Sequence, residues 1–159
     1  MKPHCAPDPM LIVEPAHPLD DGPRALLEQS HDLMTTLFEP EENYFLGFDA
    51  LCAPEVHFIV AREGDAVLGT AAVVDKGDYG EVKSMFTSPA ARGKGVGAAL
   101  MRAIEDHART AKLSALKLET ARELPAAIRL YERHGFTECD RFGDYIPNST
   151  SYFMQKQID

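Results

Sequence analysis

The sequence predicts an α/β protein, more specifically an α+β fold in which one mixed sheet is flanked by helices. Two β-rich runs at 55–63 and 66–75 are joined by the turn residues EGDA, which indicates an antiparallel hairpin. Apolar residues recur at helical spacing from Val96 to Ala108. Another β-rich run follows at 115–120, so a strand, a helix and a strand form a unit that makes parallel neighbours.

The remaining elements follow from similar patterns. A first strand is expected at 10–16 and an amphipathic helix at 22–38, with loop and a short helix at 39–54. Residues 81–88 form a third run in the meander, which Pro89 ends. A helix begins near Pro125, and Gly135 suits its left-handed C-terminal cap. Two final strands are expected near 136–142 and 151–158.

Length and charge narrow the class of protein. A chain of 159 residues can bury a hydrophobic core, and residues 1–159 are expected to form a single domain. The net charge of −9 argues against a nucleic-acid partner. No run approaches the roughly 20 apolar residues of a membrane helix, so no membrane partner is expected.

The charge is unevenly distributed along the chain. Residues 1–80 carry 15 acids and 4 bases, whereas residues 81–159 carry 10 acids and 12 bases. The second half is therefore the better candidate for binding an anion, and the first half for facing a cation. Solvated surface charge is the alternative interpretation of both halves.

The cysteines and histidines carry no metal or disulfide pattern. Cys5, Cys52 and Cys139 are odd in number and widely spaced, so they are expected to be reduced thiols. The first residues contain no signal-peptide core, and a cytoplasmic location is expected. No histidines stand at ligand spacing, so no metal is expected.

The segment ARGKGVGAAL at 91–100 places three glycines and two cations before an amphipathic helix. Helix N-terminal amides attract anions, and glycine lets the backbone approach them closely. A P-loop does not fit, because the glycine spacing is too short and Ala98 has no hydroxyl for magnesium. A dinucleotide fingerprint does not fit either, because Ala98 and Leu100 stand where glycine is needed. A glycine-rich connector without a ligand remains an alternative.

The pattern that does fit is Arg-x-x-Gly-x-Gly, formed by Arg92, Gly95 and Gly97. Downstream, AAIRLYERHGF at 126–136 carries the pattern A-x-x-LY-x-x-x-GF. These two segments, which span residues 80–136 together with the strand between them, resemble the GNAT N-acetyltransferases. More narrowly, EVKSMFTSPAARGKGVG, LKLET and FGDYIPNSTSYFMQK are similar to a bacterial subgroup described as indole-acetic-acid or general small-molecule acetyltransferases.

The resemblance implies the acyl-CoA N-acyltransferase fold, in which a mostly antiparallel sheet contains one splayed parallel strand pair. It implies a single N-acetyltransferase domain that moves an acetyl group from acetyl-CoA, its co-substrate, directly to a primary amine of a small molecule or peptide. A non-catalytic acyl-CoA-binding sensor or assembly module is the alternative function. A homodimer is compatible with the apolar tail SYFM.

The resemblance also implies which residues hold acetyl-CoA. Amides of the SMFT segment would face pantetheine and the thioester, and the glycine loop would hold the pyrophosphate. The implied cofactor-binding residues are Ser84, Met85, Phe86, Thr87, Arg92, Gly93, Lys94, Gly95, Val96, Gly97 and Ala98. The family often has an asparagine seven residues before its tyrosine. Leu124 stands there in this chain, so that pantetheine contact is absent or made by backbone.

Three residues are candidates for the proton transfers that amide formation requires. The family's tyrosine maps onto Tyr131, which would protonate the leaving thiolate; its alternative interpretation is an apolar core residue. An ammonium group must lose a proton before it attacks. Glu81 matches the base of the histone-acetylating branch, and Glu119 matches the glutamate of the ribosomal N-terminal acetyltransferases. Glu81, Glu119 and water remain open as proton acceptors, and either glutamate could instead point to solvent.

The acceptor is expected to meet the segment 39–54. Its acidic and aromatic side chains would form a wall that suits a cationic or aromatic amine. These residues are Glu39, Glu41, Glu42, Tyr44, Phe45, Phe48 and Asp49. Exposed loop charges are the alternative interpretation. Tyr145 is expected either to reach the same cleft or to pack against the sheet.

Overall fold

The computed structural model describes residues 10–159, which form one seven-stranded sheet with helices on both faces. The strands are β1 (Leu11–Pro15), β2 (Val56–Glu63), β3 (Ala66–Asp75), β4 (Tyr79–Thr87), β5 (Ala115–Ala121), β6 (Thr137–Glu138) and β7 (Ser151–Gln157). The helices are α1 (Asp21–Leu37), α2 (Phe48–Leu51), α3 (Val96–Thr110) and α4 (Pro125–Arg133), with 3-10 turns η1 (Pro40–Glu42) and η2 (Pro89–Ala91).

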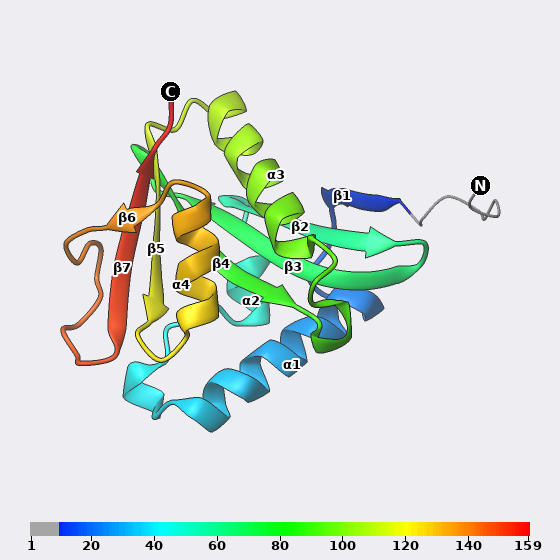
Figure 1. Ribbon diagram of the computed structural model, residues 1–159, viewed down its shortest axis with the longest axis horizontal. Helices are drawn as coiled ribbons and strands as arrows, with labels where there is room; N and C mark the ends of the chain where they lie inside the picture. Colours follow the sequence, from blue (N-terminus) through cyan, green and yellow to red (C-terminus); the bar gives the residue numbers. More distant parts are fainter. Residues whose placement is uncertain (1–9) are drawn as a thin grey trace, which may run out of the picture.

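The sheet order is β1-β2-β3-β4-β5-β7-β6. Every neighbouring pair is antiparallel except β4 and β5, which are parallel. That parallel pairing covers only Tyr79↔Ala115 to Glu81↔Lys117, although β4 continues to Thr87. The two strands diverge beyond this point, as Figure 1 shows. The predicted mixed sheet with a splayed parallel pair is therefore confirmed.

Two helix layers cover the two faces of the sheet (Figure 1). On one face, α3 and α4 pack over a core that includes Val73, Leu100 and Leu118. On the other, α1 and α2 contribute Leu27 and Leu51 to a smaller cluster. Each such buried side chain stabilises the fold by about 1.5–3 kcal/mol relative to an exposed one.

Most predicted elements are confirmed. The apolar stripe of α3 is buried as expected, with Val96, Leu100, Ile104 and Ala108 at most 2% exposed. Gly135 follows α4 with φ +90°, the left-handed conformation expected of a helix cap. Among the described residues, no helix is both long enough and apolar enough to cross a bilayer.

The strand expected at 136–142 is wrong in its length. Only Thr137–Glu138 pair with β7, and a last backbone bond joins Cys139 to Phe153. The chain then leaves the sheet as a loop that bends at Gly143, where φ is +61°. Cys139 and Cys52 are free thiols, and Cys5 lies outside the described residues.

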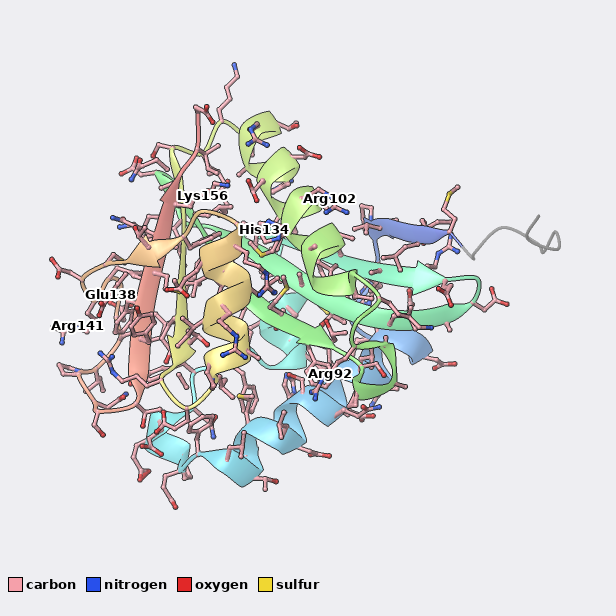
Figure 2. The ribbon with its side chains drawn as sticks, viewed as in Figure 1. Arg92, Arg102, His134, Glu138, Arg141 and Lys156 are labelled. Carbon is pink, nitrogen blue, oxygen red and sulfur yellow. The ribbon has the colours of Figure 1, made fainter. Side chains whose placement is uncertain are left out.

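A buried ion cluster connects α3, α4 and β7. The Lys156 ammonium donates to Glu105 Oε1 at 2.5 Å and to the His134 carbonyl at 2.6 Å. Glu105 is 7% exposed and also lies 3.8 Å from the Arg109 guanidinium. Figure 2 shows Lys156 and His134 side by side at the C-terminal end of α4. A carboxylate this deeply buried depends on its cation, because an unpaired buried charge is costly.

We expect Lys156→Met to lower the free energy of unfolding by about 2 kcal/mol, because Glu105 loses its nearest cation. Urea denaturation measures the change. The matched control is Arg24→Met, which removes an exposed pair with Glu28 and should leave the urea midpoint almost unchanged. Equal effects of the two substitutions would contradict the structural role given to Glu105.

Candidate active site

The site begins at a bulge in β4, at the place where β4 and β5 separate. Thr70 pairs with Phe86 and Ala72 pairs with Lys83, so β4 carries one residue more than β3 over this stretch. Ser84 takes up the extra length with φ +55°, and its carbonyl accepts from Thr70 Oγ1 at 2.8 Å. The Ser84 hydroxyl is buried and has no hydrogen-bond partner among the described residues.

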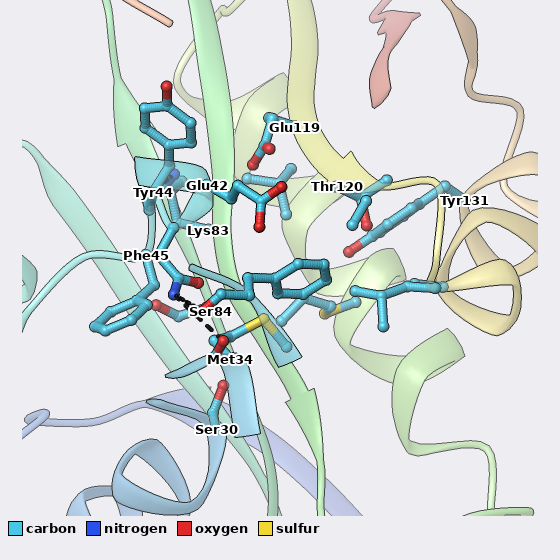
Figure 3. A pocket seen from close by; sticks show the side chains of 17 residues that line it. Ser30, Met34, Glu42, Tyr44, Phe45, Lys83, Ser84, Glu119, Thr120 and Tyr131 are labelled. Carbon is cyan, nitrogen blue, oxygen red and sulfur yellow. Dashed lines mark hydrogen bonds between the residues drawn. The ribbon is translucent and has the colours of Figure 1, made fainter. Parts of the chain in front are cut away.

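The separated strands leave a cleft with a cavity of about 140 Å³. Side chains from both strands, from α1 and from α4 line it. Figure 3 shows the Tyr131 hydroxyl and the carboxylates of Glu119 and Glu42 directed into this cavity from different walls. The structure therefore brings together Ser84, Met85, Glu119 and Tyr131, four of the residues singled out in the sequence.

Glu119 lies near the end of β5 and faces the cleft. Its Oε2 accepts a hydrogen bond from Ser151 Oγ at 2.7 Å. Burial raises the pKa of this carboxyl above its usual value, while the Ser151 bond and the Lys83 charge oppose the rise. A carboxylate whose pKa moves toward neutrality is a better proton acceptor at neutral pH.

Tyr131 combines both interpretations that the sequence left open. Its ring packs in the core and the residue is 6% exposed, yet it also lines the cleft. Burial, followed by the nearby charge of Glu119, raises the pKa of the phenol well above its usual range. The hydroxyl therefore stays protonated at neutral pH and can donate a hydrogen bond into the cleft.

Glu81 is buried in a different environment. Its Oε2 accepts a short hydrogen bond from the Tyr145 hydroxyl and lies 3.7 Å from the Lys83 ammonium. Lys83 donates in turn to Tyr145 Oη at 2.8 Å and to the Tyr44 carbonyl at 2.7 Å. These bonds connect β4 to Tyr145 in the loop before β7 and to Tyr44 in the segment after α1. Glu81 lines a second cavity of about 470 Å³ that adjoins the cleft at Tyr44 and Lys83.

The predicted anion loop lies at the N-terminus of α3. Gly93 and Gly95 have φ +84° and +79°, and both face open space. Arg92 is exposed in this loop (Figure 2). The first amides of α3, at Val96, Gly97 and Ala98, have no acceptor within the helix. Gly97 serves packing as well, because a Cβ there would lie 3.1 Å from Leu130 Cδ2.

Only part of the expected acidic and aromatic wall reaches the cleft. Glu42, Tyr44 and Phe45 line it. Of the two alternatives for Tyr145, packing against the sheet is the one observed: its ring lies on Phe153 of β7, with centroids 5.4 Å apart, and it lines the second cavity rather than the cleft. Tyr44 packs edge-on against it, with ring centroids 4.7 Å apart. The other predicted residues lie elsewhere: Glu39 caps η1, Glu41 and Asp49 are exposed, and Phe48 packs against the cluster around Leu27.

Comparisons with known proteins agree with this geometry. Residues 24–136 match the Acetyltransferase (GNAT) family. A relative from Azospirillum brasilense, named IAA acetyltransferase, is 39% identical over 152 residues, which cover 94% of this chain and 99% of the relative. The chain belongs to the GNAT acetyltransferase family.

Solved structures share the GNAT fold over nearly the whole chain. A Klebsiella pneumoniae protein, provisionally described as an acyl-CoA N-acyltransferase, superimposes with a TM-score of 0.78 at 28% identity and covers 94% of this chain and 99% of that one. The Salmonella typhimurium protein yncA, solved with its cofactor acetyl-CoA, superimposes with a TM-score of 0.71 at 22% identity, over 94% of each chain.

The GNAT family uses acetyl-CoA, and the residues of this chain fit that molecule. The α3 N-terminus offers unpaired amides to its phosphates, and the gap between β4 and β5 leads to the unpartnered Ser84 hydroxyl. Sequence reasoning missed Lys83, Thr150 and Ser151, which contact the cleft or its carboxylates. Among residues 10–159, no group of histidines, cysteines and carboxylates could hold a metal ion.

The left-handed backbone of the anion loop gives a direct test. We expect Gly95→Ala to lower the free energy of unfolding by about 1 kcal/mol, because a Cβ at φ +79° is strained even in open space. Thermal or urea unfolding measures it. Gly95→Asn is the matched control: asparagine tolerates the left-handed region better than alanine, so stability should fall less than in Gly95→Ala. A neutral Gly95→Ala would contradict this description of the loop.

Proposed function

We propose that this protein transfers an acetyl group from acetyl-CoA to a primary amine, with Glu119 as proton acceptor and Tyr131 as proton donor. One observation carries the proposal. The carboxylate of Glu119 and the phenol of Tyr131 line one cleft at the splay of β4 and β5. A cytoplasmic location suits the free thiols Cys52 and Cys139.

The chain would hold acetyl-CoA mainly through backbone. The amides from Ser84 to Thr87 would pair with pantetheine and face the thioester carbonyl, where a donor stabilises the oxyanion that forms during attack. The loop from Arg92 to Ala98 would hold the pyrophosphate. Lys94 lies 3.7 Å from Glu63, so its charge is partly engaged and its substitution should be mild.

The chemistry then needs two proton transfers. The acceptor nitrogen attacks the thioester carbon, so a C–N bond forms and the C–S bond breaks. Glu119 takes the proton that the nitrogen loses, and Tyr131 gives a proton to the departing thiolate. Solvent restores both groups. Glu81 is the weaker candidate for the proton acceptor, because it lines the second cavity rather than the cleft that holds Tyr131.

The lining of the cleft favours a cationic acceptor. Glu42 and Glu119 contribute carboxylates, and Tyr44 and Phe45 contribute aromatic surface. Lys83 is the basic side chain in this lining, and its ammonium is paired with Glu81 and Tyr145. An ammonium group would therefore meet mostly carboxylates and aromatic rings. The name of one relative, IAA acetyltransferase, adds indole-acetic acid to the compounds to test. It carries a carboxylate and no primary amine, so this lining predicts that it is not acetylated.

The proposal is tested by release of coenzyme A thiol across polyamines, amino acids, aminoglycosides, N-terminal peptides and indole-acetic acid. We expect thiol release with at least one amine and formation of its amide by mass spectrometry. Binding of acetyl-CoA without thiol release from any amine would instead favour the acyl-CoA-binding module.

We expect Glu119→Gln and Tyr131→Phe each to lower kcat by about 10²-fold or more, because each removes one proton-transfer group. Affinity for acetyl-CoA should be unchanged, as calorimetry would measure. Glu81→Gln is the comparison, with an expected loss of less than about tenfold, because Gln can still accept from Tyr145. A larger loss in Glu81→Gln than in Glu119→Gln would overturn the assignment of the proton acceptor.

A further inference from the structure

The turn that begins β7 holds two buried hydroxyl groups beside the cleft. Thr150 and Ser151 are each 5% exposed. The Asn148 side chain organises both, because its Oδ1 accepts from the amides of Thr150 at 2.8 Å and Ser151 at 2.7 Å. Its Nδ2 also donates to Ser151 Oγ at 3.1 Å.

Each hydroxyl is bonded to a carboxylate that lines the cleft. Thr150 Oγ1 lies 3.0 Å from Glu42 Oε2, and Ser151 Oγ lies 2.7 Å from Glu119 Oε2. Because Asn148 Nδ2 already donates to Ser151 Oγ, the Ser151 hydroxyl hydrogen is free to be donated to Glu119. The direction of the hydrogen-bond chain from Asn148 through Ser151 to Glu119 is therefore fixed.

The sheet register places Ser151 where it can act on Glu119. Ser151 of β7 pairs with Ala121 of β5, and the pair Glu119↔Phe153 lies two residues further along both strands. Side chains two residues apart share one face of a sheet, so Ser151 and Glu119 are diagonal neighbours on the cleft face. A buried hydroxyl costs free energy unless it is bonded, so this serine is held in place by its two partners.

We propose that Ser151, oriented by Asn148, is a positioning residue that holds Oε2 of Glu119 and leaves Oε1 to the incoming amine. This inference rests on the proposed function, because it assigns a role to a neighbour of the proposed proton acceptor. Oε1 has no hydrogen bond from any residue within 10–159, and the carboxylate is directed into the cavity (Figure 3).

Ser151 also affects the pKa of Glu119, together with the other titratable groups that face this carboxyl. These groups are Lys83 and Glu81 of β4, Tyr131 of α4, Tyr145 of the loop before β7, and Glu42, which lines the same cavity. Burial and Glu81 raise the pKa of Glu119, whereas Ser151 and Lys83 lower it. Removal of the Ser151 hydroxyl therefore raises that pKa, and the active carboxylate form is lost at a higher pH.

The test is the pH profile of kcat for Ser151→Ala at saturating acetyl-CoA and amine. We expect its acidic limb to move up by roughly one pH unit, because a hydrogen bond to a charged group is lost. The KM for acetyl-CoA should be unchanged, and Ser151→Thr, which keeps the hydroxyl, should restore the profile. Ser114→Ala is the control, because Ser114 lies just before β5, at the end away from Glu119, and its hydroxyl donates only to the Asp78 carbonyl.

A second measurement keeps the two proposals apart. The carboxyl carbon of Glu119, assigned by its loss in Glu119→Gln, is titrated by NMR in the wild type and in Ser151→Ala. A higher titration midpoint in Ser151→Ala supports the inference whether or not an amine is acetylated. Absence of thiol release with any amine would overturn the proposed function and leave this coupling standing.

Two results would overturn the inference while the proposed function survives. In the first, the wild type is active and Glu119→Gln is inactive, but Ser151→Ala shifts neither the acidic limb of the pH profile nor the NMR titration midpoint of Glu119. The other is a loss of kcat in Ser151→Ala that is equal at every pH, which would give Ser151 a structural role only.

Discussion

The separation of β4 from β5 is the constraint on which the rest of the site depends. Parallel pairing ends at Glu81↔Lys117, and the bulge at Ser84 turns the following residues of β4 away from β5. Main-chain groups along the open edges then lack strand partners, which an extended ligand could supply. The same separation lets Tyr131 of α4 and Glu119 of β5 reach one cavity. The anion loop before α3 follows directly from the end of this strand.

A site of this kind has to keep several polar groups away from water. Glu81, Lys83 and Tyr145 satisfy one another, and Ser151 satisfies one oxygen of Glu119. These bonds offset the cost of burying charge, so the carboxylates near the cleft differ in what they can do. Glu119 lines the cleft together with Tyr131, whereas Glu81 lines the second cavity and bonds to Tyr145. The proposed division between a reactive and a structural carboxylate therefore rests on the place of each one in the fold rather than on the residue type.

The sequence predicted what depends on local pattern. Local sequence determines three confirmed features: the apolar spacing of α3, the hairpin of β2 and β3, and the left-handed conformation of Gly135. The sequence did not decide between Glu81 and Glu119 as the proton acceptor. Each has a lysine two residues away on the same strand, so either could belong to a solvent-exposed face of the sheet. The choice depends on Tyr145 and Ser151, which lie 64 and 32 residues away. The strand expected at 136–142 was too long, because its end depends on where the chain leaves β7, which no local residue pattern marks.

We propose that the open edge of β4 and the α3 N-terminus together hold an acyl-CoA thioester. Backbone amide shifts of the ¹⁵N-labelled protein, recorded during titration with acetyl-CoA, test it most directly. We expect the amides within Ser84–Thr87 and Val96–Ala98 to respond together and to saturate at one concentration, while those of β1 stay unchanged. Saturable binding that leaves both segments unmoved would contradict it.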